Sequence, residues 1–155
     1  MTYRETMKAF NVDHVQKSEY PILVKVWEAS VRATHAFLKE EDITYFKPLI
    51  LNTYLDVVEL RCARDSKGNI LGFSGVADNN LEMLFIHPDS RGKGIGKKLL
   101  AHAIDELEVQ KVDVNEQNEQ AVGFYEQYGF GVVGRSALDA SGKPYPILHM
   151  ELNNI

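Results

Sequence analysis

Cysteine is nearly absent from this chain of 155 residues, in which Cys62 is the only one. A single thiol excludes an internal disulfide and every metal site built from several cysteines. Cys62 lies in the apolar run Val57 to Ala63, so we expect it to fill space in the core rather than to act as a catalytic thiol. Without a disulfide framework, the cytoplasm is the expected compartment.

Long apolar runs are also missing. No stretch approaches the roughly 18 consecutive apolar residues of a membrane helix, and residues 1–6 lack the apolar run of a signal peptide, so no membrane partner is expected. The apolar share of 45% and charged share of 25% are those of a soluble globular chain and exclude wholesale disorder. We predict a polar extension over 1–11 and a single domain over 12–155.

Positive charge is in deficit, with 17 Lys and Arg against 22 Asp and Glu. Domains that bind nucleic acid duplexes usually carry a basic excess, so nucleic acid is not expected as a partner. One segment departs from this average, because Arg91, Lys93, Lys97 and Lys98 lie within eight residues. Such a cluster in an acidic protein is typical of a site for a polyanionic ligand.

Apolar spacing and turn residues predict seven strands and four helices in the order βααβββαβαββ, hence an α/β or α+β fold with a mixed sheet. Ser18 is expected to cap the first helix, with Pro21 in its first turn, and Asn118 to cap the last, which Gly129 ends. The expected strands are 12–16, 57–63, 70–77, 81–86, 111–114, 132–138 and 145–152. The expected helices are 18–34, 41–51, 95–107 and 118–129.

The most informative segment runs from Leu81 to Leu100, where a strand leads into a glycine-rich turn and an amphipathic helix. The amides of such a turn and the positive end of the helix dipole together predict a phosphate site. The Walker motif does not fit, because no Ser or Thr follows Gly96-Lys97. The dinucleotide motif Gly-x-Gly-x-x-Gly does not fit either, because the glycines here are Gly92, Gly94 and Gly96.

Two motifs resemble those of the GCN5-related N-acetyltransferases, the GNAT superfamily. Arg91-x-x-Gly94-x-Gly96, after Leu84 to Pro88, resembles the coenzyme A-binding motif, and Asn115 to Phe130 resembles the block Asn-x-x-Ala…Tyr-x-x-x-Gly-Phe. The resemblance implies a mixed, mostly antiparallel sheet of about six or seven strands flanked by about four helices. The segments most similar to the YjaB-type bacterial acetyltransferases of this family are 114–135, 142–146 and 26–38.

The resemblance implies acetyl-CoA as cosubstrate and no metal. Backbone groups of Leu84 and Ile86 would bond the acetyl carbonyl and the pantetheine arm, and an amide near Leu84 would stabilise the developing oxyanion. The implied cofactor contacts are Leu84, Phe85, Ile86, Arg91, Gly92, Lys93, Gly94, Ile95, Gly96, Lys97, Asn118 and Tyr125.

Tyr125, seven residues after Asn118, matches the general-acid tyrosine of the family. Its hydroxyl would protonate the leaving thiolate, whose thiol has a pKa of about 8.5 by analogy with cysteine. A tyrosine that only packs on the apolar face of its helix is the alternative interpretation.

Glu82 is the candidate base, because it lies four residues before Ile86, where several family members carry an acidic residue that acts through water. A lysine-like acceptor has a pKa of about 10.4 and must lose a proton before it attacks. Strand alternation would place Glu82, Leu84 and Ile86 on one face unless a bulge intervenes. A solvated strand carboxylate is the alternative, and His35 and Asp113 are alternative bases.

By resemblance, the first two helices and the last hairpin build the acceptor pocket, for a small-molecule or peptide amine. Aromatic residues at helical spacing are equally typical of a core. The candidates are Trp27, Ser30, Val31, Thr34, His35, Phe37, Leu38 and Tyr145. The other histidines have no metal-ligand spacing, so we expect surface or core positions for His14, His87, His102 and His149.

Three functions compete. The first is an enzyme that moves an acetyl group from acetyl-CoA to a primary amine by direct attack in a ternary complex, and dimers are common in its family. The second is a non-catalytic acyl-CoA-binding or sensor domain, and the third is a nucleotide-binding module that uses the same glycine loop. The presence of both Tyr125 and Glu82 favours the enzyme.

Overall fold

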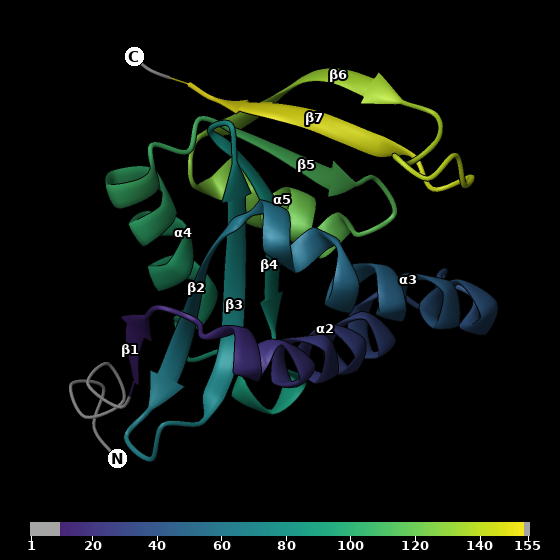
Figure 1. Ribbon diagram of the computed structural model, residues 1–155. Coiled ribbons are helices and arrows are strands. Elements are labelled where there is room, and N and C mark those ends of the chain that lie inside the picture. The colour runs from purple at the N-terminus through teal and green to yellow at the C-terminus, as the bar shows by residue number, and fades with distance from the viewer. Residues whose placement is uncertain (1–9, 154–155) are drawn as a thin grey trace.

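A seven-stranded sheet lies at the centre of the computed structural model, which describes residues 10–153 (Figure 1). Its order is β1-β2-β3-β4-β5-β7-β6, and every neighbouring pair is antiparallel except β4 and β5. The strands are β1 (Phe10–Asp13), β2 (Glu59–Asp65), β3 (Ile70–Ala77), β4 (Asn80–Ile86), β5 (Lys111–Asn115), β6 (Phe130–Ser136) and β7 (Ile147–Leu152). The helices are α2 (Tyr20–Thr34), α3 (Glu40–Asn52), α4 (Ile95–Leu107) and α5 (Glu119–Gln127), with 3-10 turns η1 (Lys17–Glu19), η2 (Tyr54–Val57) and η3 (Pro88–Ser90).

The predicted element order is confirmed, and two local expectations at the start of the chain are wrong. The first strand begins at Phe10, inside the expected extension, and ends at Asp13 because pairing with β2 stops there. Ser18 lies within η1 and does not cap α2; Gln16 and Glu19 instead form a capping box on η1. Residues 1–9 of the expected extension lie outside the described residues.

The helices cover both faces of the sheet (Figure 1). On one face α2 and α3 pack on the sheet around Leu23, Ile43 and Phe73, and on the other α4 and α5 pack on it around Leu100. Cys62 is fully buried in the first of these clusters, as predicted, and burial raises the pKa of its thiol to about 11. No helix within residues 10–153 is long and apolar enough to cross a membrane.

The parallel pair β4–β5 creates the opening in the sheet. Its register contains only Asn80 with Lys111 and Leu81 with Val112, after which the two strands diverge. The edge of β4 that faces β5 therefore has no strand partner beyond Leu81 within the described residues, and its backbone groups are free for a ligand.

A bulge interrupts β4 at Glu82. Leu81 lies opposite Val76 and Met83 lies opposite Gly75, so Glu82 has no partner on β3. The extra residue breaks the alternation: Leu81 packs with the α4 and α5 cluster, whereas Met83 packs with the α2 and α3 cluster. The simple alternation that would align Glu82 with Leu84 and Ile86 therefore does not hold.

Candidate active site

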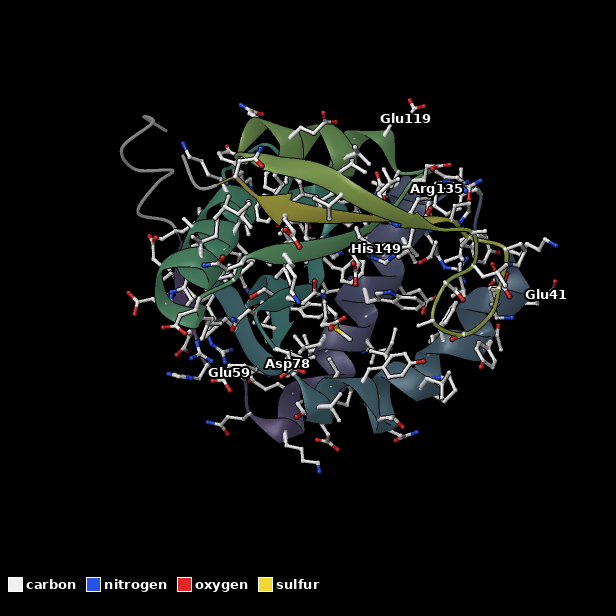
Figure 2. The ribbon with its side chains drawn as sticks, turned by 90° about the horizontal axis from the view of Figure 1, so that it is seen from above. Glu41, Glu59, Asp78, Glu119, Arg135 and His149 are labelled. Atoms are coloured by element: carbon white, nitrogen blue, oxygen red, sulfur yellow. The ribbon has the colours of Figure 1, made fainter. Side chains whose placement is uncertain are left out.

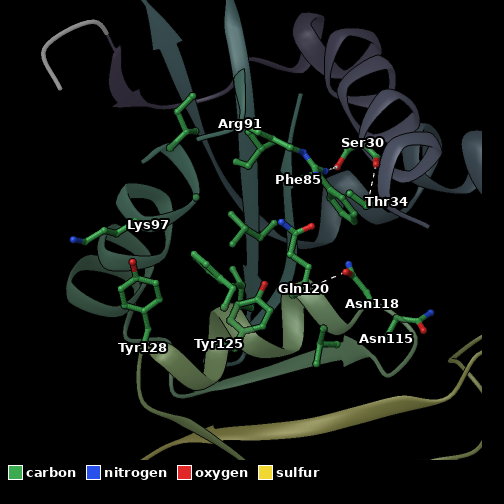
Figure 3. A pocket seen from close by; sticks show the side chains of 18 of the residues that line it. Ser30, Thr34, Phe85, Arg91, Lys97, Asn115, Asn118, Gln120, Tyr125 and Tyr128 are labelled. Atoms are coloured by element: carbon green, nitrogen blue, oxygen red, sulfur yellow. Dashed lines mark hydrogen bonds between the residues drawn. The ribbon is translucent and has the colours of Figure 1, made fainter. Parts of the chain in front are cut away.

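A cavity of about 510 Å³ opens between the diverging ends of β4 and β5, beside the N-termini of α4 and α5 (Figure 3). We call it the first cavity. It brings together almost the whole set of predicted cofactor contacts, and among them only Lys93 is missing from the described lining. The predicted contacts that line it are Leu84, Phe85, Ile86, Arg91, Gly92, Gly94, Ile95, Gly96, Lys97, Asn118 and Tyr125.

The glycine loop turns sharply at two left-handed residues. Gly92 has a φ of 77° and Gly94, which precedes the first residue of α4, has a φ of 81°. Side chains with a Cβ are strained in this region, so glycine is required by the backbone rather than by crowding. The first backbone bond of α4 runs from Lys98 N to Gly94 O at 3.0 Å, which leaves the preceding amides free among the described residues.

A chain of hydrogen bonds joins this loop to α2 and α5. Arg91 donates to Ser30 Oγ at 3.4 Å, and Thr34 Oγ1 donates to the Ser30 carbonyl at 2.8 Å (Figure 3). His35 Nδ1 lies 2.9 Å from Thr34 Oγ1, and His35 Nε2 lies 3.5 Å from Asn118 Nδ2. The chain therefore orients the side chains that face the first cavity.

His35 is a poor base in this position. Burial, reinforced by the positive charge of Arg91, lowers the pKa of its imidazole to about 4. The ring is neutral at neutral pH, and its Nε2 faces the amide of Asn118. Because the Nε2 lone pair faces that amide at 3.5 Å, His35 is better suited to orienting Asn118 than to taking a proton from the acceptor.

Asn118 caps α5 as predicted, because its Oδ1 accepts a hydrogen bond from Ala121 N at 3.3 Å. That bond fixes the amide so that its Nδ2 faces His35. The capping role and a position at the first cavity are thus both present in one side chain.

Tyr125 is buried on α5, with its ring edge-on to Phe124 and Phe130. Figure 3 shows its hydroxyl directed into the first cavity. Burial raises the pKa of this phenol, because the charged form loses its hydration. The hydroxyl therefore stays protonated at working pH and can donate a proton.

A second cavity, of about 650 Å³, combines apolar and acidic walls. Glu82, Asp113 and Asp139 line it, and no lysine or arginine occurs among its described lining residues. Glu82 and Asp113 line the first cavity as well, so the two cavities adjoin at these two residues. Its apolar lining residues are Phe46, Tyr54, Val57, Val58, Ala77, Met83, Leu138, Ala140 and Ile147.

The residues expected on the acceptor side divide between the first cavity and the protein interior. Ser30, Thr34 and His35 line the first cavity. Trp27, like Val31, is buried in the α2 and α3 core, against which Leu38 packs. The two remaining aromatic rings, of Phe37 and Tyr145, lie 6.0 Å apart and line neither cavity.

Tyr145 ties the β6–β7 connection to α3. Its hydroxyl donates to Asp42, which also forms an ion pair with Lys143 at 2.8 Å. This position explains why Tyr145 lines neither cavity: its hydroxyl is held by a buried carboxylate.

The sequence analysis did not predict most of the residues that line the second cavity. Its apolar residues come from α3, η2 and the residue after it, β3, β4 and the β6–β7 hairpin, so no local spacing connects them. His149, for which we expected a surface or core position, also lines it, as does Ser136, to which no sequence pattern points. Within residues 10–153 no group of three or more His, Cys, Asp or Glu side chains could hold a metal ion.

The chain resembles proteins of known class over most of its length. Residues 49–152 match the family model described as "Acetyltransferase (GNAT) domain". Over 128 residues the chain is 43% identical to the peptidyl-lysine N-acetyltransferase YjaB of Escherichia coli (strain K12), an alignment that covers 83% of this chain and 86% of that protein.

Solved structures give the same result. The solution structure of apo-form YjaB from Escherichia coli has a TM-score of 0.86 and 38% sequence identity, covering 94% of this chain and 99% of that chain. The PaiA N-acetyltransferase from Thermoplasma acidophilum, solved in complex with coenzyme A, has a TM-score of 0.69 at 21% identity, with 94% and 99% covered, and so shares the fold.

Together these findings show an enzyme that transfers acyl groups to nitrogen. The chain belongs to the GNAT family of acetyltransferases, and the predicted similarity to its YjaB-type members is confirmed.

Proposed function

We propose that this enzyme transfers the acetyl group of acetyl-CoA to the side-chain amine of lysine in a peptide or protein. The observation that carries the proposal is the meeting of two chemically different cavities at Glu82 and Asp113. The first supplies backbone donors and cations for coenzyme A, and the second supplies apolar walls and carboxylates for a cationic side chain. The amine attacks the thioester directly where they meet.

The donor occupies the first cavity. Amides of the glycine loop and the start of α4 hold the pyrophosphate, where the helix dipole adds positive potential. The pantetheine arm lies along the free edge of β4, whose ladder pairing to β5 ends at Leu81. An amide near Leu84 bonds the thioester oxygen and stabilises the oxyanion as the tetrahedral intermediate forms.

Tyr125 is the general acid. When the carbon–sulfur bond breaks, its hydroxyl donates a proton to the coenzyme A thiolate. The raised pKa means that the phenol carries its proton before the carbon–sulfur bond breaks. The hydroxyl makes no hydrogen bond to another protein group among the described residues, so it is free for the sulfur.

Glu82 is the water-mediated base. In support, Glu82 has no partner on β3 and lines both cavities, beside the opening between β4 and β5. Its carboxylate attracts the ammonium of the acceptor and polarises a water that takes the proton. The neutral amine that remains is the nucleophile.

Two observations support lysine as the acceptor. The second cavity pairs an apolar wall, which suits the four-carbon stem of lysine, with carboxylates that suit its ammonium. The relative YjaB is named a peptidyl-lysine N-acetyltransferase. A cytoplasmic location and a homodimer stay predictions from the sequence.

The test is a panel of amines with release of the coenzyme A thiol as readout. The panel contains a peptide with blocked ends and one lysine, the same peptide with a free N-terminus and no lysine, a polyamine and a free amino acid. We expect turnover with the lysine peptide, and binding of acetyl-CoA that excess ATP or NAD does not reverse. Saturable binding without turnover of any amine would instead indicate a sensor domain, and failure to bind acetyl-CoA would reject the proposal.

A further inference from the structure

Three polar side chains form a continuous hydrogen-bonded chain across three strands beside the second cavity. His149 Nδ1 on β7 lies 2.6 Å from Asp113 Oδ1 on β5, and His149 Nε2 lies 2.7 Å from Ser136 Oγ on β6. Asn80 donates to the other carboxylate oxygen of Asp113 at 3.4 Å. All three members of the chain line the second cavity, and Figure 2 shows His149 near the middle of the molecule, on the side of β5 and β7.

The register of the sheet brings these residues together. Asp113 and His149 are direct cross-strand partners on β5 and β7. On the other side of β7, His149 pairs with Gly134, which has no side chain, and Ser136 follows two residues later on the same face. The imidazole can therefore reach a carboxylate on one neighbouring strand and a hydroxyl on the other.

The partners assign the protons of the neutral ring. An ionised carboxylate only accepts hydrogen bonds, so Nδ1 carries a proton and donates it to Asp113. Nε2 then has a lone pair, which accepts the hydroxyl proton of Ser136. The ring is thus held in the tautomer in which Nε2 can gain a proton, and the carboxylate lies where it would stabilise the resulting imidazolium.

The charged side chains around His149 are mostly carboxylates. One cation and five carboxylates share its two neighbouring cavities, and Glu82 is among them. The charged residues are Asp78, Glu82, Lys111, Asp113, Asp139 and Glu151.

We propose that His149 is the final acceptor of the proton that the acceptor ammonium loses, with Ser136 as the relay and Asp113 as the positioning residue. This inference rests on the proposed function. The ammonium gives a proton to the water held by Glu82, that water gives one to Ser136 Oγ, and Ser136 gives its own hydroxyl proton to Nε2. One positive charge moves from the amine to the imidazole, and the amine lone pair forms the new carbon–nitrogen bond. The second proton, which the nitrogen loses as the amide forms, replaces the one that Tyr125 gives to the thiolate. The imidazolium later releases its proton to solvent.

The test compares His149→Gln with the wild type, using acetyl-CoA and a blocked peptide with one lysine. At about pH 7 we expect the variant to lose about 10²-fold in kcat/KM for the peptide, the usual contribution of a proton acceptor. Near pH 10.4 half of a lysine amine is already neutral, so the loss should shrink to about threefold. The KM for acetyl-CoA and the melting temperature should not change. His14→Gln, a histidine away from both cavities, is the matched control.

Two further variants separate positioning from proton transfer. Asp113→Asn presents an amide that can donate to Nδ1, which would place the ring proton on Nε2 and block the relay, so its pH-dependent loss should match that of His149→Gln. Ser136→Ala should lose less, about tenfold or below, because a water can replace the hydroxyl.

Two results would overturn the inference while leaving the proposed function intact. One is an active wild type beside a His149→Gln variant within threefold of it at about pH 7. The other is an equal loss at both pH values, which would mean that His149 only supports the structure. A wild type that binds no acetyl-CoA, or acetylates no amine, would overturn the proposed function first and this inference with it.

Discussion

The two cavities that meet at Glu82 are built in different ways. Half of the residues that line the first lie in one stretch, 81–97, in which glycines and a helix start set the geometry. The second is made of side chains from separated segments, among them α3, η2 and the β6–β7 hairpin. A cofactor site of the first kind is visible as a motif, whereas an acceptor site of the second kind exists only once the chain has folded.

The largest effect is expected from a substitution that disrupts the first cavity and leaves the second intact. Gly94→Val puts a β-branched side chain at a φ of 81°, where only glycine is relaxed, so the loop must rearrange. We expect binding of acetyl-CoA to weaken by about 10²-fold or more, equivalent to about 2.7 kcal/mol, in a calorimetric titration. Gly123→Ala is the control, because an added Cβ there meets nothing within 4 Å. Equal binding by both variants would show that the loop does not hold the cofactor.

The next largest effect is expected at Tyr125, where a substitution should slow acetyl transfer without weakening the binding of acetyl-CoA. Tyr125→Phe keeps the ring that packs between Phe124 and Phe130 but removes the hydroxyl. We expect kcat to fall by about 10²-fold, the usual contribution of a general acid. The Kd for acetyl-CoA should stay within about threefold. Tyr20→Phe, whose hydroxyl bonds the Leu55 carbonyl away from both cavities, should keep full activity, and a Tyr125→Phe variant as fast as wild type would exclude the acid.

Glu82→Gln tests the place where the cavities meet. Removing the carboxylate weakens the attraction for the ammonium and leaves the water unpolarised. We expect kcat/KM for the lysine peptide to fall by about tenfold or more at neutral pH. Binding of acetyl-CoA should be unchanged by calorimetry. Glu126→Gln, at an exposed position on α5, controls for the loss of one charge, and a matching loss in both variants would contradict a specific role.

The smallest effect on activity is expected from Glu19→Gln, far from both cavities, which should change stability instead. Arg64, with a smaller contribution from the Gln16 amide, lowers the pKa of Glu19 to about 2, from an ordinary value of 4.5. A depressed pKa means that this carboxylate stabilises the fold above about pH 4.5 and loses its contribution as the pH falls toward 2. Glu19→Gln should lower the free energy of unfolding by about 1 to 2 kcal/mol at neutral pH.

Denaturant titrations at several pH values check this prediction. The difference between Glu19→Gln and wild type should close as the solution is acidified, while acetyl-transfer activity at neutral pH stays the same. A difference that persists at low pH would mean that the ion pair with Arg64 is not its source.

Local rules explain why much of the fold was predictable. Asn118 caps its helix through a bond to Ala121, and Gly129 ends that helix with a positive φ of 96°, as the residue types indicated. The glycine loop could be identified because Gly92 and Gly94 are required by backbone angles rather than by distant contacts.

The positions of several site candidates could not be predicted, because they depend on contacts between distant parts of the chain. The bulge at Glu82 arises from how β3 and β4 align, and alternation could not foresee it. Trp27 and Tyr145 were expected near the acceptor, but the first packs in the core and the second bonds Asp42, 103 positions earlier in the chain. His149 gained its partners only when β5, β6 and β7 came side by side.

The most direct measurement of the central claim uses a bisubstrate conjugate in which coenzyme A is joined through an acetyl bridge to the lysine amine of the blocked peptide. If the cavities meet at Glu82, one molecule can fill both, and calorimetry should give a Kd about 10²-fold tighter than that of coenzyme A alone. Gly94→Val should abolish that binding. A conjugate that binds no tighter than coenzyme A would contradict the account, because the two cavities would then not form one active site.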